Sequence, residues 1–245
     1  MISRKSKQKP LRAKLNKGPS GSILSKLFRT ILFNYGMDDK RYDALMARYI
    51  RKAAMDVNRK DRADVRAGLS GELLKTSMTW KTFLKGLKFL SIAKMSIVVR
   101  LWKSDETCIL YRQNYSLDTV EVEFGSEDDD EKLSKEGIMT AGSILGSFFE
   151  EICRELKVGK GEIPTLLAAY IKRTHVGADR RSEAAVRASL MKELFKPIMT
   201  WKSFIKGLNF LGICRFELMI VLEDGLGKNT EHSLTPIVLD EIEPE

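Results

Sequence analysis

The residues best suited to chemistry in this chain are lysines and arginines that recur at a fixed spacing of 121 positions. Residues 21 to 102 align without a gap to residues 142 to 223, and roughly a third of the aligned positions are identical, which chance does not produce over that length. Nine aligned positions are basic in both copies, whereas one, Glu72 with Glu193, is acidic in both. Because exposed faces ordinarily mix both signs, the retained cations indicate contact with anions, and a generic basic surface is the alternative.

A loop ahead of a predicted helix is the best candidate for a phosphate site. Asn58-Arg59-Lys60-Asp61, matched by Asp179-Arg180-Arg181-Ser182, places two cations where helix N–H groups and the helix dipole also attract anions. Arg66, or Arg187 in the second copy, lies about one turn into that helix. The candidate nucleic-acid-binding residues are Arg51, Lys52, Arg59, Lys60, Arg66, Lys81, Lys85, Lys172, Arg173, Arg180, Arg181, Arg187, Lys202 and Lys206.

The predicted helix that begins at Trp80 carries a second basic pattern. Its apolar residues, from Trp80 to Leu90, fall on one side at helical spacing. Lys81, Lys85 and Lys88 fall together on the flank of this stripe, where we expect them to point outward. Like charges so close together repel unless an anion such as a phosphate backbone lies along them. Lysine stems can also edge a buried stripe, and that interpretation stays open.

Two residues of the same helix are kept in both copies for reasons of packing. Trp80 and Trp201 lie on the apolar stripe, so we expect them in the core rather than stacked on bases. Gly86 and Gly207 lie inside a helix, where glycine costs roughly 1 kcal/mol relative to alanine. Their retention predicts a close approach of another helix, with close approach of a ligand as the alternative.

The sequence contains no recognisable catalytic or metal-binding set. Neither histidine, His175 nor His232, belongs to a position shared by the two copies. The segment from Gly225 to Thr230 lacks the spacing of a phosphate-binding loop and is typical of a hairpin turn. Three cysteines without a CxxC pair fit a reducing compartment. We therefore expect no enzymatic activity and no cofactor; an enzyme is the third alternative, and its site would have to use residues assigned to packing.

The net charge of +9 is distributed unevenly. It is +7 for residues 1 to 20, +10 for 21 to 102, −7 for 103 to 141, +4 for 142 to 223 and −5 for the remainder. Such asymmetry favours nucleic acid as a partner, with a membrane surface second. No apolar run approaches the ~18 residues that span a bilayer, and no apolar stretch follows the basic N-terminus as in a secretory signal. We expect a cytoplasmic protein without a membrane span.

The periodicity predicts an α+β fold with an internal tandem duplication, in which each module has about four helices followed by a β-hairpin. Composition divides the chain into a basic flexible arm (1–20), module 1 (21–122), an acidic linker (123–141) and module 2 (142–245). The spacing changes from helical to extended near Met95 and Phe216. The two hairpin turns are expected to differ in length.

The block Met-Thr-Trp-Lys-x-Phe-x-Lys-Gly-Leu, at Met78 and again at Met199, is followed by strands and by Thr230-Glu231-His232-Ser233. Together these features resemble small accessory proteins of large tailed bacteriophages, over residues 199 to 239 and their first-copy equivalents. The resemblance implies a protein made in a bacterial cytoplasm, and it transfers no activity to any residue.

The sequence therefore predicts a non-enzymatic protein that grips the phosphate backbone of DNA or RNA through paired basic surfaces, with weak sequence specificity. A protein-interaction or assembly role, with a host or virion partner, is the alternative. The choice between DNA and RNA, the strandedness, the number of modules that bind, any protein partner and the oligomeric state stay open.

Overall fold

The structure is a computed structural model that describes residues 20–53, 67–121, 132, 136–174 and 180–239. The first copy contains α1 (Gly21–Asn34), α2 (Asp39–Ala53), a helical segment at residues 67–73, α4 (Trp80–Phe89), β1 (Ile92–Lys103), β2 (Cys108–Ser116), η1 (Leu117–Thr119) and β3 (Val120–Glu121). The second contains β4 (Met139–Thr140), α6 (Ala141–Glu155), α7 (Ile163–Thr174), α8 (Arg180–Leu194), α9 (Trp201–Phe210), β5 (Ile213–Asp224), β6 (Asn229–Ser233) and β7 (Ile237–Val238).

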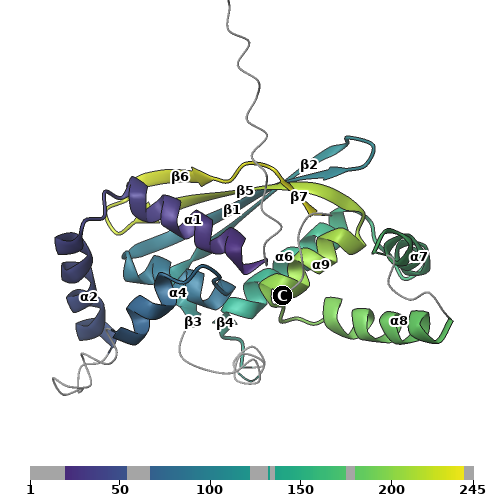
Figure 1. Cartoon of the computed structure of the whole chain (residues 1–245), viewed down its shortest axis with the longest axis horizontal. Coiled ribbons are helices and arrows are strands. Elements are labelled where there is room, and N and C mark those ends of the chain that lie inside the picture. The colour runs from purple at the N-terminus through teal and green to yellow at the C-terminus, as the bar shows by residue number, and fades with distance from the viewer. Residues whose placement is uncertain (1–19, 54–66, 122–131, 133–135, 175–179, 240–245) are drawn as a thin grey trace, which may run out of the picture.

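The long strands of both copies join in one sheet, and the short strands β3 and β4 form a separate parallel pair. A five-stranded sheet runs in the order β2-β1-β5-β6, with β7 also pairing β5, and its main pairings are antiparallel (Figure 1). The α+β class is as expected. The expected tandem pair of modules, each with four helices and a hairpin of its own, is wrong, because β1 and β5 pair along their whole length. The predicted boundaries of arm, modules and linker stay predictions, since most of the arm and linker lie outside the described residues.

The two copies meet around a pair of residues that are themselves 121 positions apart. In the β1–β5 ladder Val98 lies opposite Met219, the residue that the repeat aligns with it. The stacked rings of Trp80 and Trp201, which are also aligned, have centroids 5.8 Å apart and an interplanar angle of 12°. This places the copies in an approximately two-fold arrangement around a shared core.

The helices lie along one side of the sheet (Figure 1). On β5 the side chains of Phe216, Leu218, Ile220 and Leu222 are buried in alternation, as the two-residue period of a strand requires when one face packs on helices. No helix in the described part of the chain covers the opposite face, which carries the intervening residues of β5, both polar (Glu217) and apolar (Met219).

The hairpin turns are alike, although they were expected to differ in length. The N–H of Lys103 donates to the carbonyl of Thr107 at 3.2 Å, and the N–H of Asp224 donates to that of Lys228 at 3.1 Å. Each donor and acceptor are four residues apart, so the expectation of unequal turns is wrong. The repeat therefore extends through both hairpins at the same spacing.

Local signals in the fourth helix of each copy are confirmed. Thr79 caps α4 by accepting a hydrogen bond from the Thr82 N–H at 3.1 Å. A Cβ added at Gly86 would lie 2.5 Å from the Phe28 ring, and α1 packs on α4 at this point. The absence of a side chain is what lets the two helices approach so closely.

Candidate nucleic-acid interface

Two of the predicted phosphate-binding lysines are ion-paired inside the fold. The Lys85 Nζ lies 3.0 Å from Glu72 Oε2, and the Lys206 Nζ lies 2.6 Å from Glu193 Oε2. Lys85 is 6% exposed. The one acidic position shared by the copies is therefore the partner of a shared basic position. This pairing explains why both charges are retained: a lysine in this environment is costly unless a carboxylate compensates it.

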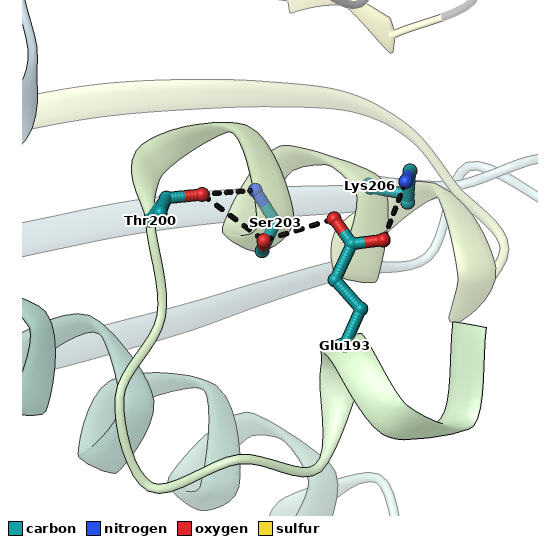
Figure 2. A network of polar contacts seen from close by, with 4 residues as sticks. All are labelled: Glu193, Thr200, Ser203 and Lys206. Atoms are coloured by element: carbon teal, nitrogen blue, oxygen red, sulfur yellow. Dashed lines mark hydrogen bonds and ion pairs between the residues drawn. The ribbon is translucent and has the colours of Figure 1, made fainter. Parts of the chain in front are cut away.

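In the second copy the ion pair belongs to a longer chain of contacts (Figure 2). Thr200 Oγ1 accepts from the Ser203 N–H at 3.1 Å and so caps α9. The Ser203 hydroxyl donates to Glu193 Oε1 at 3.0 Å, while the other oxygen of Glu193 accepts from Lys206. Both carboxylate oxygens are thus occupied, and the end of α8 is tied to the start of α9. The contacts are those of a structural link between helices.

The expected outward row of Lys81, Lys85 and Lys88 is wrong. Lys85 is buried, and the Nζ of Lys88 donates to the carbonyl of Val120, which follows β2 in the chain. Lys81 and its counterpart Lys202 are half-buried. The lysine stems edge the buried stripe, which is the interpretation that the sequence left open.

The basic pairs before the predicted phosphate loops lie at helix ends. Lys172 and Arg173 are exposed in the last turn of α7, where cations complement the helix dipole. Arg173 also donates from Nη2 to the carbonyl of Asn209 at 2.6 Å, which ties α7 to α9. Arg187 is exposed on α8. Arg59, Lys60 and Arg66 lie outside the described residues, as do the side chains of Arg51, Lys52, Arg180 and Arg181.

The helices that carry these basic segments are far apart. α2, whose last turn holds Arg51 and Lys52, lies at one end of the long axis, while α7 and α8 lie at the other (Figure 1). The shared cations of these helices therefore do not come together in one surface. A single groove lined by both copies has no support from this arrangement.

The shared basic position Lys94/Arg215 has a different partner in each copy. Lys94 forms an ion pair with Glu223 at 2.7 Å, whereas its counterpart Arg215 lies over the Trp102 ring, 4.5 Å from the centroid. These partners face each other in the β1–β5 ladder. Both interactions lie on the uncovered face of the sheet and join the two copies.

A different group of cations, on and beside α1, is exposed and has no carboxylate partner among the described residues. On α1, Lys26 and Arg29 are exposed, and Phe33 is 84% exposed. The turn after the helical segment at 67–73 adds Leu74, which is 52% exposed, and Lys75. This turn contacts α1 because Arg29 Nη2 donates to the Leu74 carbonyl at 3.4 Å. We call these five residues the α1 patch.

The same place on α6 has the opposite character. Lys26 and Arg29 align with Ser147 and Glu150, and Phe33 aligns with Arg154. Arg154 forms an ion pair with Glu151 one turn earlier. The divergence is visible in the sequence, whereas the sequence-based prediction rests on the cations that both copies keep. In the structure, the retained cations Lys85 and Lys206 serve packing. Lys26 and Arg29, which the second copy lacks, are exposed beside Lys75, which the second copy keeps as the exposed Lys196.

A polar depression of about 510 Å³ lies on the uncovered sheet face. Its lining includes Lys94 and Arg112, but also Glu223 and Glu231. Because Lys94 is already paired with Glu223, the depression offers little net positive charge to a polyanion.

Burial shifts the pKa of two groups that could serve as nucleophile or base. Burial raises the pKa of the Cys153 thiol to about 12, so it stays protonated at neutral pH. Burial lowers the pKa of His232, whose Nδ1 lies 3.1 Å from Asn34 Nδ2 and whose ring stacks on Tyr35. The imidazole ties β6 to the end of α1.

Comparisons of this chain with protein-family models, with curated proteins and with solved structures find no match. None of the helices in the described ranges combines the length and apolar character that crossing a membrane requires.

Proposed function

We propose that the protein is a non-enzymatic nucleic-acid-binding protein that contacts the phosphate backbone through the α1 patch, with little preference for base sequence. One observation carries the proposal. α1 presents Lys26 and Arg29 to solvent and contains no acidic residue, whereas the aligned helix α6 occupies the matching place in the fold with Ser147 and Glu150. α6 forms without cations at these positions, so a partner is the better explanation for them.

The patch is large enough for weak, salt-dependent binding. Lys26, Arg29 and Lys75 would neutralise about three phosphates, and each phosphate contributes about −0.9 to the slope of log K against log salt on a duplex. The basic residues of the N-terminal segment, which lie outside the described residues, would add to this slope. Dissociation constants of about 10⁻⁴ to 10⁻⁶ M at physiological salt are typical of such binding.

A charge-matched pair of variants tests the proposal. The double variant Lys26→Ser/Arg29→Glu installs the residues of the second copy and lowers the net charge by three. The control Lys160→Ser/Lys192→Glu lowers it by the same amount at exposed positions of the second copy. Fluorescence anisotropy with labelled DNA and RNA, at several salt concentrations, gives affinity and slope for each protein.

We expect the α1 variant to lose about tenfold or more in affinity and about two units of salt slope, because two phosphate contacts are removed. The control should stay within about twofold of the wild type. A wild-type slope near zero would contradict nucleic-acid binding itself. Equal losses in the two variants would show that net charge acts without the patch.

A protein-interaction role is the second candidate, and the exposed side chains of Phe33 and Leu74 favour it. Such a partner would remain bound after nuclease treatment and at high salt, where phosphate contacts are lost. A cytoplasmic location is part of the proposal in both cases, since Cys108, Cys153 and Cys214 are all free thiols.

A further inference from the structure

Phe33 is the most unusual residue of the α1 patch. Its side chain is 84% exposed, although large apolar side chains normally gain stability by leaving water. The neighbouring aromatic residues of α1 are engaged, since Phe28 packs edge-on against Phe83 and Tyr35 stacks on His232. Within the described part of the chain, Phe33 has no comparable ring contact.

The fold itself does not require a phenylalanine at this position. The aligned residue of α6 is Arg154, which is exposed and ion-paired with Glu151. α6 nevertheless has a capped N-terminus, packs on α9 and buries its apolar face. An exposed ring that the other copy replaces with a charge therefore has a cause outside the packing of the helix.

The cations of α1 lie on the same helix face as the Phe33 ring. Lys26, Arg29 and Phe33 are spaced at i, i+3 and i+7, so they share one face of the helix. At 1.5 Å per residue, the ring lies about 6 Å beyond Arg29 and about 10 Å beyond Lys26 along the axis. A chain of phosphates that follows the helix past the two cations would bring its next base to the ring.

We infer that the α1 patch takes a single strand, with a base stacked on Phe33 and the preceding phosphates held by Arg29 and Lys26. This inference rests on the proposed function. In a duplex the faces of the bases are covered by their neighbours, so an exposed ring finds no base to stack on. A single strand presents free base faces, and stacking on aromatic residues tolerates every base. Leu74 extends the apolar surface beside the cations.

The test compares strandedness in the full-length protein. Phe33→Ala removes the ring, and Phe33→Trp keeps an aromatic face at the same exposed position. The probes are oligothymidine, oligouridine and a mixed-sequence DNA duplex of equal length. We expect Phe33→Ala to weaken binding of the two single strands by about thirtyfold, the middle of the range that loss of one stacked base produces, with less than a twofold effect on the duplex.

Phe33→Trp should keep the affinity for single strands, and its added indole fluorescence should be quenched when oligothymidine binds. Far-ultraviolet circular dichroism of all variants checks that the fold is intact. An equal effect of Phe33→Ala on single strands and duplex, or no effect on either, overturns the inference.

The outcomes separate the two proposals. If Lys26→Ser/Arg29→Glu loses binding to every probe while Phe33→Ala changes none, the phosphate contacts stand and the single-strand inference fails. If the charge variant has no effect on any probe, both fail.

Discussion

α1 and α6, which the sequence repeat aligns, are alike on their buried faces and different on their outer faces. Both helices carry a glycine-serine-isoleucine-leucine start, and each packs an aromatic ring against a glycine of the helix behind it. Their outer faces differ in sign, since α1 exposes Lys26 and Arg29 where α6 has Ser147 and Glu150. The buried side of a repeated helix is constrained by its neighbours, while its outer side is free to change. In this molecule the buried shared residues serve folding, whereas the proposed binding surface combines two residues that differ, Lys26 and Arg29, with the shared and exposed Lys75.

The shared glycines should give the largest effects and should act alike in the two copies. A Cβ added at Gly86 meets Phe28 at 2.5 Å, and one added at Gly207 meets Phe149 at the same distance. We expect Gly86→Ala and Gly207→Ala each to lower the free energy of unfolding by about 3 kcal/mol, the upper end for overpacking, as measured by urea denaturation.

The control for these variants is Gly71→Ala in the helical segment at 67–73, where an added Cβ meets nothing within 4 Å. It should be neutral or stabilising by up to about 1 kcal/mol, because alanine is the better helix former. A large loss in only one of Gly86→Ala and Gly207→Ala would break the equivalence of the two cores.

The shared ion pairs should differ in size, because their burial differs. The Lys85 side chain is 7% exposed and that of Lys206 is 28% exposed. We expect Lys85→Met to cost about 2 kcal/mol, since Glu72 loses its partner beside the core, and Lys206→Met to cost about 1 kcal/mol or less.

Denaturation of Glu72→Gln/Lys85→Met completes a double-mutant cycle for the first pair, with Glu193→Gln/Lys206→Met as its counterpart. Equal coupling energies in the two copies would contradict the expected effect of burial, and values near zero in both would contradict a structural reason for keeping these charges.

The stacked tryptophans should show the smallest difference between copies. Trp201 Nε1 donates to the Ser20 carbonyl at 2.9 Å, whereas Trp80 Nε1 is buried without a partner among the described residues. Replacement by phenylalanine removes similar volume in both cases, so Trp201→Phe should cost about 1 kcal/mol more than Trp80→Phe. Thermal unfolding followed by circular dichroism measures the difference. If Trp80→Phe proves the costlier change, the assignment of the hydrogen bond is wrong.

The candidate site was only partly accessible from the sequence. The divergence of Lys26 and Arg29 from Ser147 and Glu150 is visible in the alignment, but exposure is not, and without it the shared lysines look equally available. Lys85 shows the difficulty. Its spacing on α4 fits an outward flank, yet Glu72, thirteen residues earlier, holds it inside. Which side chains find partners depends on contacts between helices, and a helical period does not contain that information.

The sequence by itself determined what is local and repeated. It established the sequence repeat, the α+β class and the close approach at Gly86, because helical periodicity acts over a few residues. Only the tertiary structure decided that β1 pairs with β5 around Val98 and Met219, and so merged the copies into one body. The backbone hydrogen bonds of a strand edge are the same for any partner strand. The side chains that two strands bury together therefore decide which strands pair.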